Sequence, residues 1–213
     1  HNRAFRLWGE IWKSVLIDLK LDPKGIENEF ARQNLIGCIA NGEEPIALHL
    51  YSFYSMDSDA ARATDYLSGN YTDLYFQKLK NMGVRTMMSM EYMTVHPAWR
   101  RRQSGLHLGS VLVGTTLRAL DSFGFDAAVA PARRDHKVHE IAYAFGGECI
   151  VENVINHNVP CDLLANVRWK ITPHENPAVN ALATKLWRNR IFSSQNSSEP
   201  SDENSSQKIR KIG

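Results

Sequence analysis

The stretch "VHPAWRRRQSGLHLGSVLVG", residues 95–114, places three consecutive arginines and a glycine in front of an apolar segment. The residues before it, "VRTMMSMEYMTV" (84–95), are typical of a strand, and the apolar spacing behind it predicts a helix over residues 105–123. A helix N-terminus presents free backbone N–H groups that attract anions, and arginine adds charge-assisted hydrogen bonds to phosphate. The stretch therefore predicts a site for a phosphate-bearing ligand. The alternatives are a nucleic-acid patch or charges that only solvate a loop.

The overall composition argues against several classes of partner. The 213 residues have a net charge of only +2, whereas proteins that bind phosphate backbones usually carry a wider basic excess, so we expect no nucleic-acid partner. No run is apolar and long enough to cross a bilayer, so we expect no membrane partner. The cysteines are scattered at positions 38, 149 and 161 without a CxxC pair, which is typical of a reducing cytoplasm and argues against a structural metal site.

The remaining sequence predicts a mixed α/β domain over residues 1–192. Asn41-Gly42 predicts a hairpin between two strands, and Asp22 with Pro23 predicts the start of a helix in 21–33. The serine-rich residues 193–213 can bury almost nothing and should be disordered. The other predicted elements are a helix in 4–20, a mostly helical insert in 57–82, a short buried strand in 125–132, a helix in 135–145, a strand pair in 148–171 and a last helix in 177–192.

The opening stretch resembles the acyl-CoA signature of the GNAT superfamily of N-acyltransferases. Val95, Pro97 and Arg100 match the first part of that signature, and residues 102–107, "RQSGLH", match the part that leads into a helix. Downstream, the family often has an Asn, a Tyr and a Gly at a spacing that His136, Tyr143 and Gly147 reproduce. His107 and His136 depart from the usual residue types. The resemblance implies a twisted, mostly antiparallel sheet flanked by helices.

The resemblance also implies the reaction and the donor site. The reaction would be transfer of an acyl group, most simply acetyl, from acyl-CoA to a small-molecule amine. The thioester arm would pair with the strand at Met93–Val95, and the diphosphate would meet the N–H groups of residues 103–109. No metal is expected, since "HKVHE" (136–140) matches no zinc motif. The donor-binding residues implied are Met93, Thr94, Val95, Arg100, Arg102, Gln103, Ser104, Gly105, Leu106, His107, Leu108, Gly109 and His136.

Two residues are candidates for catalysis. Alternation along a strand places Glu91 on one face with Met87, Ser89 and Met93, and an apolar setting would raise the pKa of its carboxyl group and suit a general base. The alternative is an exposed strand glutamate. Tyr143 is the candidate acid for the departing thiolate, by analogy with the family tyrosine, and the alternative is an aromatic packing residue.

Two features bear on the substrates. The methionines at 87, 88, 90 and 93 are either adaptable core residues or a pocket for an acyl chain longer than acetyl. With the insert 57–82, they suggest N-acyl amino acid or acyl-homoserine-lactone synthases, which take acyl groups from acyl-CoA or acyl carrier protein. The insert is also a candidate acceptor-side lid, because its aspartates at 57, 59, 65 and 73 could attract a cationic amine. A non-catalytic CoA-binding module is the rival interpretation, and a homo-oligomer is compatible with all of them.

Overall fold

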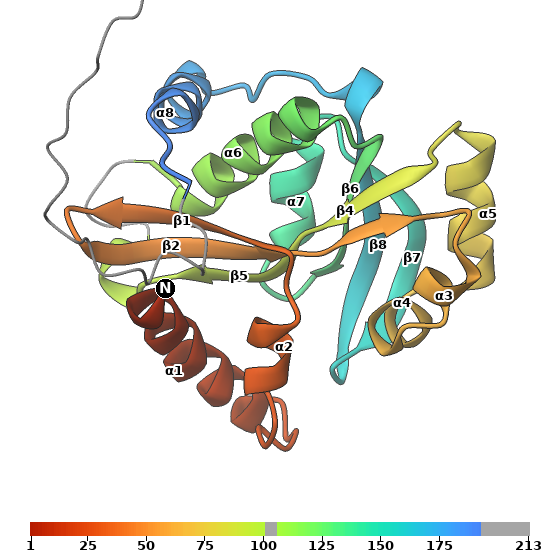
Figure 1. Ribbon diagram of the computed structural model, residues 1–213, viewed down its shortest axis with the longest axis horizontal. Coiled ribbons are helices and arrows are strands. Elements are labelled where there is room, and N and C mark those ends of the chain that lie inside the picture. The colour runs from red at the N-terminus through yellow and green to blue at the C-terminus, as the bar shows by residue number, and fades with distance from the viewer. Residues whose placement is uncertain (101–105, 193–213) are drawn as a thin grey trace, which may run out of the picture.

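The computed structural model describes residues 1–100 and 106–192, which form a bent sheet with helices on both faces (Figure 1). The strands are β1 (Leu35–Asn41), β2 (Glu44–Tyr51), β3 (Phe53–Ser55), β4 (Thr86–Ser89), β5 (Glu91–Val95), β6 (Ala127–Arg133), β7 (Glu148–Asn156) and β8 (Val159–Val167). The helices are α1 (Asn2–Asp18), α2 (Glu27–Ala31), α3 (Asp59–Arg62), α4 (Asp65–Asn70), α5 (Asp73–Asn81), α6 (Leu108–Phe123), α7 (Val138–Tyr143) and α8 (Pro177–Arg188).

The strands form two hydrogen-bonded groups that share two bent segments of chain. One group has the order β1-β2-β5 and the other β3-β4-β6-β8-β7, and every neighbouring pair is antiparallel except β4 with β6. Ser52 separates β2 from β3, and Met90 separates β4 from β5, so the same two segments cross from one group into the other. The predicted fold class, a mixed and mostly antiparallel sheet flanked by helices, is confirmed.

A gap opens in the sheet where β5 leaves β6. β4 pairs with β6 from Met87 to Ser89, and the Met90 N–H still donates to the Val129 carbonyl at 2.8 Å. Beyond that bond, β5 pairs only with β2, while β6 pairs with β8. Within β5, Tyr92 has a φ of 53°, and the register against β2 shifts between Leu48 and Leu50, as in a β-bulge. The bulge turns β5 away from β6, so the single strand predicted over residues 84–95 is in fact two.

Three groups of apolar side chains cover the sheet. α6, α7 and α8 pack on one face, α1 and α2 lie under β2 and β5, and α3 to α5 cover the end formed by β4 and β7 (Figure 1). The α6 helix is the most deeply placed, with Val111, Leu112 and Leu120 almost fully buried. It ends at Gly124, whose φ of 74° is the left-handed conformation that glycine adopts without strain. The strands and helices around the gap are thus held by separate clusters of buried side chains.

Several predicted boundaries change in the structure. The Asn41-Gly42 hairpin and a helical insert are confirmed, the latter as α3, α4 and α5. The second helix is shorter than predicted: Asp22 accepts a hydrogen bond from the Lys24 N–H in a turn, and α2 begins five residues after it, at Glu27. α6 begins at Leu108 rather than at residue 105. The predicted tail, 193–213, lies outside the described residues.

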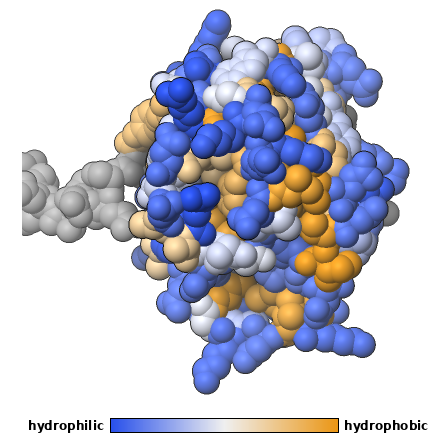
Figure 2. All heavy atoms as spheres, turned by 90° about the vertical axis from the view of Figure 1, so that its right-hand side faces the viewer, coloured by the Kyte–Doolittle hydropathy of each residue, from blue (hydrophilic) through white to orange (hydrophobic). Residues whose placement is uncertain are grey.

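The face on the right of Figure 1 is shown directly in Figure 2, where hydrophilic side chains surround separate apolar patches. The elements on that side carry two exposed apolar side chains, Leu74 of α5 and Ile155 of β7. In the described part of the chain, none of the helices is both long enough and apolar enough to span a membrane.

Candidate active site

A cavity with mostly apolar walls lies in the gap between β5 and β6 and has a volume of about 460 Å³. Met93 and Val95 of β5 form one wall, and Ala130 and Ala132 of β6 form the other. Alternate positions of β6 are occupied by small residues facing α6, which leaves the gap unfilled. The cavity continues from the start of α6 on one side of the sheet to the α1 side chains Ile11, Trp12 and Val15 on the other.

Most of the described residues implied as donor ligands line this cavity. They are Met93, Val95, Arg100, His107, Leu108, Gly109 and His136. Thr94 does not: it is fully buried, and its hydroxyl accepts a hydrogen bond from the indole N–H of Trp12 at 3.0 Å. Leu106 is half-buried and packs against the core. Arg102, Gln103, Ser104 and Gly105 lie outside the described residues, so their predicted roles stay predictions.

The start of α6 faces the cavity. His107 is the N-cap, and its Nδ1 accepts the Ser110 N–H at 3.2 Å, while the His107 carbonyl accepts the N–H groups of Ser110 and Val111. Within the described part of the chain, the N–H groups of Leu108 and Gly109 have no such partner. They are therefore the donors that an anion in the cavity would meet. Arg100 adds a guanidinium, held by a 3.0 Å bond from its Nε to the Val95 carbonyl.

A second cavity of about 210 Å³ adjoins the first. It lies between α1, α2, α4 and the β7–β8 hairpin, and in Figure 1 the tip of that hairpin lies between α2 and α4. The two cavities share the wall formed by Trp12, Met90, Tyr92, Pro131 and Arg133. A molecule in either cavity would therefore meet a molecule in the other at the gap between β5 and β6.

Glu91 lies on the second cavity and is bound by a set of polar partners. Its side chain is 1% exposed, and its carboxylate forms an ion pair with Arg32. The Ser89 hydroxyl and the Gln33 amide also donate to it, at 2.5 and 3.2 Å. Burial raises the pKa of the Glu91 carboxyl, an effect that Arg32, Ser89 and Gln33 oppose. The predicted contact with Ser89 and the raised pKa are confirmed, and the alternative of an exposed glutamate is wrong. Polar groups of Arg32 and Gln33, rather than Met87 and Met93, complete the surroundings of the carboxylate.

Tyr143 faces away from both cavities. Its hydroxyl donates to Asp162 at 2.9 Å, and Asp162 also accepts from Arg134 at 2.9 Å. Burial raises the pKa of Tyr143, and its side-chain partners Cys149 and Asp162 raise it further. The residues of α7 that line the first cavity, between β5 and β6, are Val138, Ile141 and Ala142 instead. The role of Tyr143 as an acid stays a prediction, and one that requires its bond to Asp162 to change.

Two of the four methionines are core residues, and two line a cavity. Met87 and Met88 are fully buried and belong to different apolar clusters, on opposite faces of β4. Met90 and Met93 line the cavity between β5 and β6. Only the second pair is therefore placed to contact a ligand in that cavity.

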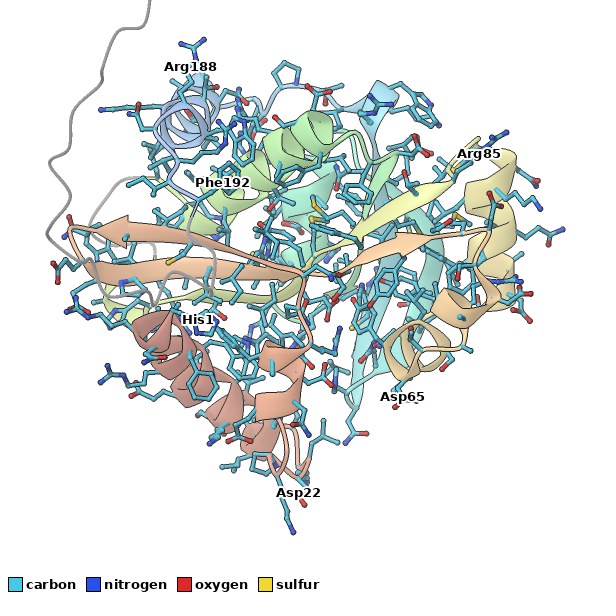
Figure 3. The ribbon with its side chains drawn as sticks, in the orientation of Figure 1. His1, Asp22, Asp65, Arg85, Arg188 and Phe192 are labelled. Carbon is cyan, nitrogen blue, oxygen red and sulfur yellow. The ribbon has the colours of Figure 1, made fainter. Side chains whose placement is uncertain are left out.

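The insert contributes one helix to the second cavity. Asp65, Tyr66 and Asn70 of α4 line it, whereas α5 packs its aromatic side chains into the core. Figure 3 shows Asp65 at the base of α4, on the side of the molecule where α2 and the hairpin tip also lie. Asp65 is the aspartate of the insert that lines this cavity. Asp59 instead forms an ion pair with Arg62.

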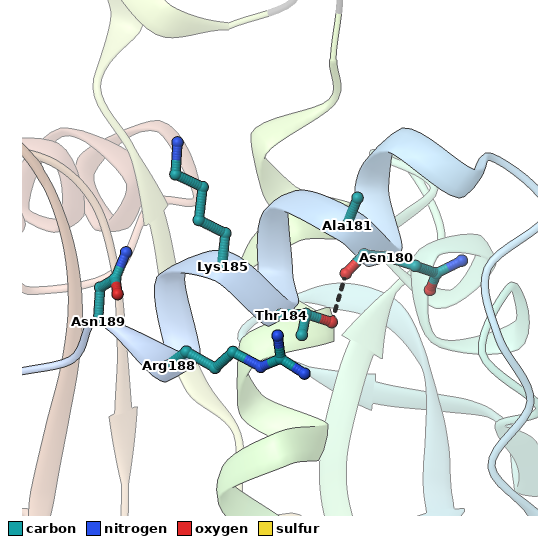
Figure 4. Close-up of a pocket in the computed structure, with 6 residues that line it drawn as sticks. All are labelled: Asn180, Ala181, Thr184, Lys185, Arg188 and Asn189. Carbon is teal, nitrogen blue, oxygen red and sulfur yellow. Dashed lines mark hydrogen bonds between the residues drawn. The ribbon is translucent and has the colours of Figure 1, made fainter.

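A further hollow lies on the outer face of α8 (Figure 4). It is open, and only side chains of α8 and of Asn189 line it. The half-buried Thr184 hydroxyl donates to the Asn180 carbonyl at 2.7 Å and accepts hydrogen bonds from Arg118 of α6, so it is satisfied within the protein. The hollow brings together no residues from other elements, and we assign it no chemistry.

Sequence reasoning missed several residues at the two cavities. Trp12, Arg32 and His49 come from elements far from the signature stretch. Arg133 directly follows the strand predicted over 125–132, and His157 lies within the strand pair predicted over 148–171. No local pattern distinguishes them, because each reaches the site through the packing of helices or the pairing of strands that are distant in the sequence. The one local signal is the run of alternating small residues in "FDAAVAPA", which predicts a strand with little side-chain volume on one face.

Comparison with known proteins supports the fold. No model of a protein family matches the sequence, and no curated protein matches it either. The chain is similar to the crystal structure of arylalkylamine N-acetyltransferase 2 from Aedes aegypti, with a TM-score of 0.50 and 11% identity over 69% of this chain and 80% of that one. The fold is therefore that of the GNAT acyltransferases.

Two synthases are also similar in structure, with lower scores. FeeM, an N-acyl amino acid synthase from uncultured soil microbes, gives a TM-score of 0.48 and 11% identity over 63% of this chain and 68% of that one. BjaI, a CoA-dependent acyl-homoserine lactone synthase, gives 0.47 and 10% over 87% and 81%.

Proposed function

We propose that this protein is an N-acyltransferase that moves an acyl group from acyl-CoA to a small-molecule amine. The observation that supports this most strongly is the pair of cavities that meet at the gap between β5 and β6. One has apolar walls and ends at a helix N-terminus and Arg100, which suits a thioester arm with a diphosphate. The other carries carboxylates and aromatic rings, which suits an amine. Acyl transfer requires just such a meeting of two substrates.

In this proposal the donor lies along β5. The N–H groups of Leu108 and Gly109 and the guanidinium of Arg100 meet the diphosphate, and His136 lies at the same cavity on the α7 side. Arg102 to Gly105 would complete the phosphate site. The amine attacks the thioester carbon directly, so one group must take a proton from nitrogen and another must supply one to sulfur. Glu91 and Tyr143 were the candidates for these steps from the sequence.

A donor chain longer than acetyl is the second candidate. It is favoured by the depth of the donor cavity, which reaches Ile11 and Val15 of α1 past Met90 and Met93. Flexible thioether side chains adapt to a ligand of varying shape. The same observation would serve an acyl group carried on acyl-CoA or on acyl carrier protein, and transfer assays with each donor distinguish them.

The test begins with binding and proceeds to turnover. Coenzyme A should raise the melting temperature, because a ligand that binds only the folded state stabilises it. Acetyl-CoA and octanoyl-CoA are then mixed with phenethylamine, tryptamine and amino acids, and thiol release is followed. Amine-dependent release supports the proposal, and a strong preference for acetyl-CoA would contradict the long-chain form. Binding without release from either donor would favour a non-catalytic module. Arg102→Ala should raise the KM for the donor.

Gly109→Ala should weaken donor binding with little effect on kcat. A Cβ at Gly109 would lie 2.9 Å from His107 Cε1 and 3.2 Å from Ile141 Cδ1, so the wall of the donor cavity has to shift. We expect the KM for acyl-CoA to rise about tenfold, which corresponds to roughly 1.4 kcal/mol. Gly9→Ala in α1 is the matched control, because a Cβ there meets nothing within 4 Å. An unchanged KM in Gly109→Ala would place the donor elsewhere.

A further inference from the structure

The proposed reaction needs a base that is free to take the proton of the amine, and this inference rests on that proposal. Glu91 already accepts hydrogen bonds from Arg32, Ser89 and Gln33. Tyr143 faces Asp162, away from both cavities. The two residues suggested by the sequence are therefore engaged with other side chains. The second cavity has other titratable groups that could take the proton.

His157 lies on that cavity, at the turn between β7 and β8. Among the described residues, none forms a hydrogen bond or an ion pair with its imidazole, and the residue is exposed to solvent.

The backbone around His157 is held in a specific conformation. His157 has a φ of 47° and Asn158 a φ of 61°, both in the left-handed region. The Asn158 amide donates to the Leu19 carbonyl at 3.2 Å, which fastens the turn to the end of α1. The tight turn and its hydrogen bond to Leu19 together fix the direction of the His157 Cα–Cβ bond.

The charges around His157 come from four elements. Glu29 of α2, Asp65 of α4 and Glu91 of β5 are the carboxylates on the cavity, and Arg133 of β6 is the cation. The α1 side chains there, Trp12 and Leu19, carry no charge, and the Cys161 thiol has a pKa raised by burial to about 11. Partial burial lowers the pKa of His157 below its ordinary value; Glu29 opposes this effect and Arg133 reinforces it. At pH 7 the imidazole is therefore neutral and able to accept a proton.

We propose that His157 is the general base that deprotonates the acceptor amine. The nitrogen lone pair forms a bond to the thioester carbon while one N–H proton passes to the imidazole. The C–S bond then breaks with its electron pair on sulfur, and a proton is returned to the thiolate from the imidazolium through water. An amine and a thioester thus give an amide and a thiol with no net gain or loss of protons. The carboxylates of the cavity attract the amine as its ammonium form, which loses its extra proton to solvent first.

The test is the variant His157→Asn, because asparagine tolerates the left-handed backbone and has no titratable ring. With the best amine of the panel and acetyl-CoA, we expect kcat to fall roughly 100-fold or more. The fall in rate of the wild type below pH 7 should flatten in the variant, and added imidazole should restore part of the rate. His174→Asn is the matched control: His174 packs on Phe145, outside both cavities.

The outcomes separate this inference from the proposed function. If the wild type acylates an amine and His157→Asn keeps its kcat and its pH profile, His157 is not the base, while the proposed function stands. If no amine is acylated and coenzyme A leaves the melting temperature unchanged, the proposed function itself fails.

An independent readout is the NMR signal of the His157 ring, identified by its absence in the variant. It should titrate below the usual histidine range and shift on addition of phenethylamine. A titration in the usual range, or a signal that phenethylamine leaves unmoved, would overturn the assignment without any activity measurement.

Discussion

Replacing Arg32 with methionine is expected to lower the free energy of unfolding by about 3–5 kcal/mol at neutral pH. Glu91 is 3% exposed, and Arg32 is its only cationic partner among the described residues. Without Arg32 the carboxylate would be buried beside Ser89 and Gln33 alone. Removing one member of a buried ion pair leaves an uncompensated charge, which costs more than the pair itself contributes. Urea or thermal unfolding measures the loss.

The pH dependence of this variant has a definite sign. In the wild type, burial raises the pKa of Glu91 and Arg32 opposes that rise. In Arg32→Met the opposition is gone, so the folded-state pKa is higher still. A protonated Glu91 carboxyl carries no charge, so its burial costs little. The free energy of unfolding of the variant should therefore be closest to that of the wild type at acidic pH. Its deficit should grow as the pH rises through the pKa of Glu91.

A double variant isolates the charge from the packing. Arg32→Met combined with Glu91→Leu removes both charges, and an apolar replacement of a buried pair is often close to neutral. Most of the lost stability should return. Equal losses in the single and double variants would mean that Arg32 acts through its contacts with Glu29 and the ring of Tyr66, which it also touches.

Replacing Ala130 with phenylalanine should abolish donor binding while the protein remains folded. Ala130 lies on β6, and its side chain lines the same cavity as Met93 of β5. A phenyl ring there occupies the space that the pantetheine arm of the donor needs. We expect no rise in melting temperature with coenzyme A and a fall of at least about 100-fold in kcat/KM, equivalent to roughly 2.7 kcal/mol.

Ala130→Ser is the control, since it changes polarity with little volume. It should keep donor binding and turnover. Circular dichroism of the phenylalanine variant checks that the sheet still forms, because the added ring also contacts the α6 side of the core. Normal coenzyme A binding in a folded Ala130→Phe protein would mean that the donor does not lie between β5 and β6.

The elements that could be predicted are those with a strong local signal. The Asn41-Gly42 turn and the apolar stripe of α6 each carry their information within a few residues of one another. The resemblance of residues 95–107 to the GNAT signature led to the correct fold class and to a cavity at the start of α6. Free backbone N–H groups arise wherever a helix begins, and the local sequence specifies where α6 begins.

The arrangement of the candidate active site could not be predicted in the same way. The environment of Glu91 depends on Arg32 and Gln33, which lie close to it only because β2 pairs with β5. Strict alternation fails between Met90 and Tyr92, because the positive φ of Tyr92 reverses which side chain faces which side of the sheet. His157 carries no motif, and it reaches the second cavity through the length of the β7–β8 hairpin. The environment of Glu91, the break in alternation and the position of His157 all depend on how strands pair in the folded sheet.

The divergence of β5 from β6 has a consequence for how this protein could change over time. Two walls of the first cavity are strands of the sheet itself, so backbone pairing sets the width of the cavity. The neighbouring cavity, by contrast, is lined by α2, α4 and a hairpin tip, which sit at the periphery. Under the proposed function, substitutions there should change the choice of amine while donor binding is retained.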